Sequence, residues 1–244
     1  YRRQRQMCIR DRIKMKIVVI NGQNHKGSTY HLGRILAEKI SDDITEFFLP
    51  RDFGEFCCGC TNCFAKSETL CPHYKKLKPL TEAMDSADVL IFTSPVYVFH
   101  CTGSMKAFLD HYGYRWMVHR PEEKMFTKQA IVLSTAAGAG MKSTNKDIKH
   151  SMFFWGVGRI YTYGAAVMET SWERVKDKKK AKISKKLDKI AKQVKSCYGR
   201  VTPSVKTKVL FNVLSKVQKN GFNQADADYW KDKGWDGKKR PWKK

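Results

Sequence analysis

Five of the eight cysteines lie close together, and thiols at this spacing can hold a metal centre. Cys57, Cys60, Cys63 and Cys71 follow the pattern Cys-x2-Cys-x2-Cys-x7-Cys, with Cys58 between the first two. Exported proteins would pair such residues as disulfides, but no apolar export segment opens this sequence. We therefore expect a reduced, cytoplasmic protein whose cysteine cluster binds metal or is redox-active.

Three further segments combine glycine, hydroxyl and amide groups in loops that suit a polar ligand. They are residues 22–29 (GQNHKGST), 94–99 (SPVYVF) and 135–140 (TAAGAG). The first ends in Ser28 and Thr29, directly before an amphipathic stretch. Backbone N–H groups and the positive end of a helix dipole would there point at one place, which suits phosphate. The same hydroxyls can equally cap a helix, and no strict Walker or dinucleotide fingerprint is present.

Each of these loops follows a short apolar run that predicts a buried strand. The expected strands are residues 16–20, 44–49, 87–92, 129–133 and 158–167, with segments of helical periodicity between them. Alternating strands and helices specify a parallel sheet covered on both faces, and five such units favour a doubly wound α/β architecture. Ligands bind at the carboxyl ends of the strands in that architecture, which is where all three loops lie.

The last long helix of this region is predicted to open at a capping box. Residues 170–173 read Thr-Ser-Trp-Glu, in which a hydroxyl and a carboxylate three residues apart can satisfy the first backbone N–H groups. Its apolar stripe begins at Val175 and runs to Val194. The predicted helix therefore starts immediately after Thr170.

The positive charge lies mainly outside this predicted fold. The formal net charge is +24, but residues 171–244 carry 23 Lys+Arg against 7 Asp+Glu, whereas residues 15–170 carry 18 against 15. A nearly neutral central region disfavours a nucleic-acid-binding module built on it.

We expect three segments along the chain. Residues 1–14 resemble translated adaptor sequence and precede Met15, so they are predicted to be a non-native N-terminal extension. Residues 15–196 are expected to form the α/β domain, and residues 197–244 a basic extension.

The basic extension contains an amphipathic helix. Its predicted apolar stripe repeats every fourth position among lysines and consists of Val205, Val209, Val213 and Val217. Such a helix, followed by tryptophans, can lie on an anionic membrane surface. Because the stripe is narrow and β-branched, we favour docking of the helix on the domain or on a second subunit.

Taken together, the three loops resemble those of the flavodoxin-like, NAD(P)H-dependent FMN reductase family, including its iron–sulfur flavoprotein branch. The family's first loop, Gly-Ser-x-Arg-x-x-(Ser/Gly)-x-Thr, corresponds to residues 22–29. Its Ser-Pro-x-Tyr loop corresponds to residues 94–97, and its small third loop to residues 135–138. The resemblance covers residues 15–194 and implies a flavodoxin-like, doubly wound five-stranded parallel sheet of order 2-1-3-4-5.

The resemblance also implies an FMN site formed by three groups of residues. The FMN phosphate would be held by Gln23, His25, Ser28 and Thr29. The isoalloxazine would lie along Pro95, Val96, Tyr97, Val98 and Phe99, and its other edge would be closed by Ala136, Ala137 and Gly138. Gln23 and His25 depart from the family's usual serine and arginine, so a titratable ring replaces a permanent charge.

No side chain is expected to be catalytic, because the flavin carries the hydride chemistry. His100, His111 and His119 follow the second loop and would border the flavin or serve as structural groups. The reaction implied by the resemblance takes a hydride from NAD(P)H and passes electrons to a small-molecule or protein acceptor. The family is usually dimeric, so a homodimer is expected.

The cysteine pattern resembles that of iron–sulfur flavoproteins, in which four thiolates hold a [4Fe–4S] cluster. The candidate ligands are Cys57, Cys60, Cys63 and Cys71. A zinc site of four thiolates, redox-active thiols and plain reduced cysteines are the alternatives. The alternative function is a flavodoxin-like or iron–sulfur electron carrier without a nicotinamide site. Such carriers tend to be acidic, and this central region is not.

Overall fold

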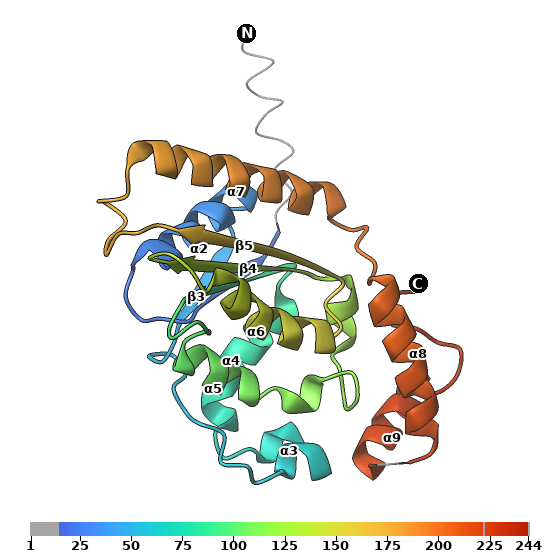
Figure 1. The fold of residues 1–244 in the computed structure, drawn as a ribbon. Coiled ribbons are helices and arrows are strands. Elements are labelled where there is room, and N and C mark those ends of the chain that lie inside the picture. The colour runs from blue at the N-terminus through green and yellow to red at the C-terminus, as the bar shows by residue number, and fades with distance from the viewer. Residues whose placement is uncertain (1–14, 222, 244) are drawn as a thin grey trace.

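Five strands form the parallel sheet that the sequence predicts. The computed structural model describes residues 15–221 and 223–243, and the predicted non-native extension at residues 1–14 lies outside them. The strands are β1 (Ile17–Asn21), β2 (Ile44–Phe48), β3 (Val89–Pro95), β4 (Gln129–Ala136) and β5 (Arg159–Ala166). They are all parallel in the order β2-β1-β3-β4-β5, which confirms the expected topology (Figure 1).

Helices cover both faces of the sheet. On one face lie α2 (Ser28–Ile40) and α7 (Asp177–Cys197). On the other lie α4 (Tyr74–Ser86), α5 (Gly103–Asp110) and α6 (Met141–Phe154). The short elements are α3 (Asn62–Ala65), η1 (Glu68–Leu70), η2 (Gly113–Arg115) and η3 (Glu123–Thr127).

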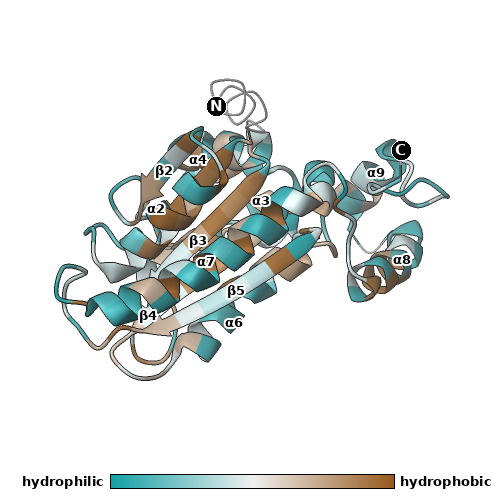
Figure 2. Cartoon of the chain, turned by 90° about the horizontal axis from the view of Figure 1, so that it is seen from above, coloured by the Kyte–Doolittle hydropathy of each residue, from teal (hydrophilic) through white to brown (hydrophobic). Residues whose placement is uncertain are grey.

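The central strands are buried on both faces, because their side chains alternate between two cores. In β1, Ile17 and Val19 point into the core under α2 and α7, whereas Val18 and Ile20 point into the core under α4, α5 and α6. Figure 2 shows β3 as apolar along most of its length, and α7 as mostly hydrophilic on its outer side. This double burial is why the central strands β1, β3 and β4 read as nearly continuous apolar runs in the sequence, whereas the edge strands β2 and β5 carry polar and exposed residues.

The C-terminal extension forms two helices, α8 (Val205–Lys219) and α9 (Gln224–Asp232), beside the sheet (Figure 1). A third apolar core joins the extension to the segment that precedes β4. Its fully buried members are Met117, Phe126, Phe211, Trp230 and Trp235. The tail therefore packs on the domain, as we favoured, and its two buried tryptophans are not free to lie on a membrane.

Docking of α8 uses the opposite face from the one that we predicted. The exposed fraction is 77% for Val205, 57% for Val209, 53% for Val213 and 39% for Val217, whereas Phe211 is completely buried. Leu210 and Leu214 pack beside Phe211 against the third core. Larger side chains bury more apolar area, so the phenylalanine and leucine face is the one that docks.

The predicted capping box was also wrong. Helix α7 begins at Asp177, its N-cap is Lys176, and residues 170–173 lie in a preceding turn region. Val175 is 2% exposed and packs into the core ahead of the first helical residue. The residues that were predicted to cap the helix therefore belong to the connection between β5 and α7. Among the described residues, no helix is long and apolar enough to cross a membrane.

Candidate functional site

The three predicted loops meet at the carboxyl end of the sheet, and we call residues 22–29, 94–99 and 135–140 the rim. Backbone hydrogen bonds connect them: Gly22 N donates to Thr93 O at 2.7 Å, and Val96 N donates to Thr135 O at 2.9 Å. The side-chain hydroxyls of Thr29 and Thr135 lie 2.5 Å apart. The strand register thus brings together residues that are more than a hundred positions apart in the sequence.

The first loop forms a small concave pocket at the N-terminus of α2. It is lined by Asn21, Gln23, His25, Gly27, Thr29, Tyr30, Thr93 and Pro95. The N-cap residue Gly27 offers no side-chain cap, so the first N–H groups of this 13-residue helix remain available. The positive end of the helix dipole therefore faces the pocket, which favours an anion there.

Two of the buried polar atoms that have no hydrogen-bond partner within the described part of the chain lie in this region. Nδ2 of Asn21 belongs to the pocket lining, and Oγ of Ser28 belongs to the residue between the lining residues Gly27 and Thr29. Asn21 uses its other atom, Oδ1, to accept from the Thr93 hydroxyl at 2.9 Å. Buried polar groups are normally paired, so these two donors fit an additional acceptor such as a phosphate oxygen. The residues present thus fit the phosphate of FMN.

The side chains of Gln23 and His25 also line the pocket. Gln23 Nε2 donates to the Tyr97 hydroxyl at 2.5 Å, which links the first loop to the second. The His25 ring lies over Gly27, where an added Cβ would come within 2.8 Å of His25 Nε2. A side chain at position 27 would therefore require the exposed His25 ring to move.

The second loop is a tight turn with an unusual backbone. Tyr97 and His100 pair in antiparallel fashion, and their N–O distances are 2.9 and 3.0 Å. The two residues between them have positive φ, 48° at Val98 and 64° at Phe99, and their side chains are 92% and 63% exposed. Asp147 anchors the base of the turn, because its carboxylate lies 3.0 Å from His100 Nδ1 and accepts from Cys101 N at 3.1 Å.

The third loop leaves open space beside the turn. A Cβ on Gly138 would meet nothing within 4 Å, and Ala137 is exposed. Gly140, in contrast, has a φ of 93°, and a Cβ there would lie 2.5 Å from Val96. The second and third loops therefore pack closely at Gly140, whereas Gly138 lies in open space.

The structure also shows what the sequence reasoning missed. Asn21, Tyr30 and Thr93 line the pocket but were not predicted. Asn21 and Thr93 could have been found from the sequence, because each is a polar residue at or near the carboxyl end of an apolar strand. Of the three histidines, His100 borders the second loop. His111 lies instead beside Cys71, and His119 lies 2.7 Å from Asp226 of the extension, so these two fit the structural role that was the alternative to bordering the flavin.

The cysteine loop (residues 51–73) lies away from the rim, over the face that carries α4 and α5 (Figure 1). Cys57, Cys58 and Cys60 are exposed, whereas Cys63 and Cys71 are partly buried. Burial raises the pKa of the Cys63 thiol, and the nearby thiols of Cys71, Cys57 and Cys60 raise it further. All four predicted ligands lie in this one loop, and thiols are the donors that an iron–sulfur or zinc centre uses. The donor atoms that lie within 4.8 Å of one another in the described part of the chain are, however, those of Cys71, His73 and His111 rather than the four thiols.

Arg120 anchors the cysteine loop through hydrogen bonds to its backbone. Its guanidinium donates to the backbone carbonyls of Cys63 and Phe64, and it pairs with Asp226 of α9 at 2.5 Å. Asn223 Nδ2 also donates to Phe64 O at 3.1 Å. The C-terminal extension therefore positions the loop that carries the thiols.

The fold is a doubly wound α/β sheet, and the rim lies at the carboxyl ends of β1, β3 and β4, where proteins of this architecture bind their ligands. The profile of the NADPH-dependent FMN reductase family matches residues 15–173, and the chain belongs to that family. It is therefore an enzyme of the FMN-dependent, NAD(P)H-oxidising class.

A curated relative and several solved structures are similar to this chain. An iron-sulfur flavoprotein from Archaeoglobus fulgidus is 30% identical over 186 residues, which cover 74% of this chain and 79% of that protein. An NAD(P)H:quinone oxidoreductase from Methanothermobacter marburgensis has a TM-score of 0.56 at 16% identity and covers 75% of this chain and 98% of its own. An azoreductase from Bacillus anthracis has a TM-score of 0.55 at 14% identity, with 75% and 99% covered. The two structures share the fold with this chain.

Proposed function

We propose that the protein binds FMN at the rim, oxidises NAD(P)H there and passes the electrons to a second acceptor. The observation that carries the site assignment is the pair of unpartnered donors, Asn21 Nδ2 and Ser28 Oγ, at the exposed N-terminus of α2. FMN supplies the hydride and electron chemistry when it is bound. The side chains of the chain have the task of binding and orienting it.

Each loop has a separate part in this proposal. Gln23, His25, Ser28 and Thr29 hold the phosphate, together with Asn21. The turn from Pro95 to Phe99 offers its backbone along the ring system, and residues 136–138 border the opposite edge. In support, the turn is fixed at its base by Asp147 and linked at its tip to Gln23 through the Tyr97 hydroxyl.

The proposal is tested by the absorption spectrum of the purified protein and by anaerobic addition of NADH and NADPH. We expect a yellow protein with one FMN per chain, whose visible band bleaches when the nicotinamide is added. A flavin spectrum that resists both nucleotides but yields to dithionite would instead indicate the electron carrier. A protein that binds no FMN when it is supplied would overturn the site assignment.

We further propose that Cys57, Cys60, Cys63 and Cys71 ligate a [4Fe–4S] cluster. Two observations support this: the four thiols gather in one loop, and the Archaeoglobus fulgidus relative is named an iron-sulfur flavoprotein. Anaerobic purification should give about four irons and four acid-labile sulfides per chain. Cys60→Ser should lose both, and Cys197→Ser is the matched control because Cys197 lies at the end of α7.

We also propose that the working form is a homodimer in the cytoplasm, as the family resemblance implies. Exposed apolar side chains at the mouth of the rim, Val98 and Phe99, are consistent with a subunit that covers them. Light scattering on the purified protein measures the mass in solution. A monomer at micromolar concentration would contradict the dimer.

A further inference from the structure

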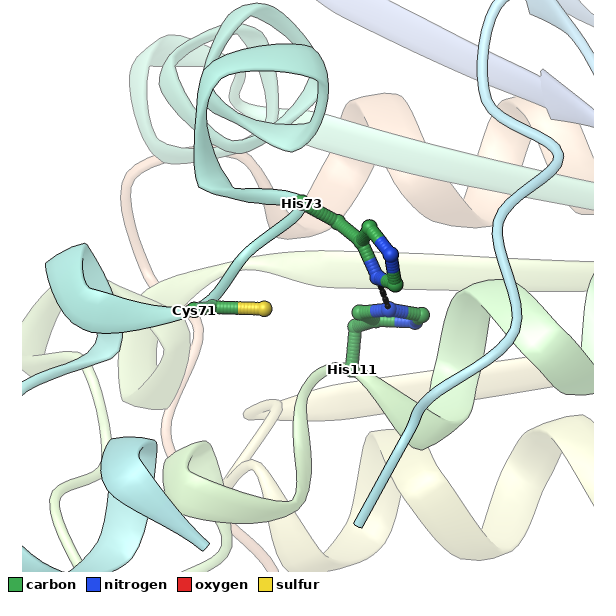
Figure 3. A group of neighbouring side chains, drawn as sticks. All are labelled: Cys71, His73 and His111. Atoms are coloured by element: carbon green, nitrogen blue, oxygen red, sulfur yellow. Dashed lines mark hydrogen bonds between the residues drawn. The ribbon is translucent and has the colours of Figure 1, made fainter. Parts of the chain in front are cut away.

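Three metal-binding side chains converge at a point outside the rim. The Sγ of Cys71 and ring nitrogens of His73 and His111 all lie within 4.8 Å of one another. Figure 3 shows the thiol directed toward the two imidazole rings. Cys71 and His73 precede α4, and His111 directly follows α5, so two separate elements supply the donors. Neither histidine is used by the proposed FMN site or by the four-cysteine cluster.

The hydrogen bonds of the two rings show where their protons lie. His111 Nδ1 lies 2.8 Å from the carbonyl oxygen of Ala107, which can only accept, so this nitrogen carries the proton. The lone pair of a neutral His111 ring is then on Nε2, and His73 Nδ1 donates to it. The other nitrogen of His73, Nε2, faces the Glu55 carboxylate at 4.0 Å, so a shift of the proton from Nδ1 to Nε2 frees the Nδ1 lone pair for a metal ion. The inward atoms, His73 Nδ1 and His111 Nε2, are 3.0 Å apart.

This hydrogen bond satisfies the two rings but leaves the Cys71 thiol unused. A metal ion satisfies all three donors at once. Around tetrahedral zinc, two such donors are separated by about 3.3 to 3.6 Å, so the nitrogens would part by a few tenths of an ångström and the sulfur would approach by roughly 1 Å.

The partners behind the rings are also those of a metal site. Histidines that bind metal ordinarily donate their other N–H to a carbonyl or a carboxylate, which fixes the tautomer and the ring orientation. Ala107 O does this for His111, and the Glu55 carboxylate is placed to do so for His73. The ring of Phe53 packs edge-on against His111 at 4.8 Å and keeps that side of the site apolar.

We propose that Cys71, His73 and His111 form a mononuclear site for a divalent transition metal ion of the zinc type. The fourth position is open to water or to another thiol of the cysteine loop. Binding releases the thiol proton of Cys71. Because Cys71 is also a candidate ligand of the iron–sulfur cluster, the ion and the cluster exclude one another at this residue. The site does not depend on FMN.

Cobalt titration of the full-length, cluster-free protein tests this site. Four-coordinate Co²⁺ with a thiolate ligand absorbs in the red, where oxidised flavin does not. We expect a single strongly bound Co²⁺ per chain, displaced by Zn²⁺, and an affinity at least about 10-fold lower in His73→Gln. His150→Gln is the matched control because that histidine is exposed on α6. Because His111 is buried, His111→Gln is interpreted only alongside its circular dichroism spectrum.

A cysteine variant separates this site from the four-thiolate centre. Cys57→Ser should keep the cobalt site while it loses the cluster, and His73→Gln should still take up a full cluster on reconstitution with iron and sulfide. Cobalt binding that is unchanged in His73→Gln would overturn the proposal, as would an unmodified protein that binds no cobalt. The FMN content of each variant is measured separately, so failure of the rim assignment is seen independently.

Discussion

The rim and the cysteine loop are both irregular backbone, yet they are held in place by different parts of the chain. Each rim loop starts at the end of a strand, and backbone bonds such as Gly22 N to Thr93 O tie neighbouring loops together. The cysteine loop follows the edge strand β2, but its first cysteine, Cys57, comes nine residues after that strand ends at Phe48. It is anchored by Arg120 and Asn223, of which the second belongs to the C-terminal extension. The sheet therefore forms one site, and the extension positions the other.

The largest effect is expected from breaking that anchor with Arg120→Met. Asp226 is 1% exposed and would lose its guanidinium partner, and breaking a buried pair costs about 3–5 kcal/mol of unfolding free energy. Denaturant unfolding measures this loss. Lys78→Met, which removes an exposed pair with Glu82, should change stability by less than about 1 kcal/mol. If FMN affinity fell as much as stability did, the separation of the two regions would be wrong.

Thiol alkylation should distinguish the regions by reactivity. Burial, aided by the Asp147 carboxylate, raises the pKa of Cys101 to about 11, so on the order of one thiol in a thousand is ionised at pH 8. In metal-free protein the exposed Cys57, Cys58 and Cys60 should react first, as followed by mass spectrometry. Labelling of Cys101 should rise about tenfold per pH unit until pH 11. Equal rates for Cys101 and Cys58 would contradict this.

Ser28→Ala should weaken FMN binding at the rim and leave the cysteine loop unaffected. A hydrogen bond to a charged group contributes about 1.5–3 kcal/mol, so FMN affinity should fall roughly 10- to 100-fold. Flavin fluorescence on titration measures the dissociation constant. Ser86→Ala is the matched control, since that hydroxyl bonds to the carbonyl of Ala83 in its own helix. FMN binding that is unchanged in Ser28→Ala would show that the phosphate does not bind in this pocket.

The smallest effect is expected at the link between the first two loops. Tyr97→Phe removes the hydroxyl that accepts from Gln23, and a hydrogen bond of this kind contributes about 0.5–1.5 kcal/mol. Tyr97 is 45% exposed, so the loss of stability should lie at the lower end. Thermal unfolding of the two proteins, compared without and with FMN, measures it. A loss above about 2 kcal/mol would show that the tip of the rim is less independent of the core than its exposure indicates.

The sequence predicted the sheet well because double burial gives the central strands β1, β3 and β4 clear apolar runs, and parallel strands then bring the three loops to one edge. It did not predict the partners that come from distant segments. His73 next to His111, and Arg120 next to Asp226, depend on how loops cross after the sheet has formed. The valine stripe misled us for a related reason, since regular spacing was weighed above the greater area of Phe211.

The backbone conformation at the tip of the second loop is energetically unfavourable for the two residues that occupy it. A two-residue turn with both φ values positive is the usual place for Asn-Gly, but this chain has Val98 and Phe99 there. A left-handed conformation costs about 1–2 kcal/mol for each residue other than glycine, and most of both side chains faces solvent. The protein is thus less stable than its own architecture permits, and half of the described non-glycine residues with positive φ lie at this exposed tip, the others being Thr61 and Met168.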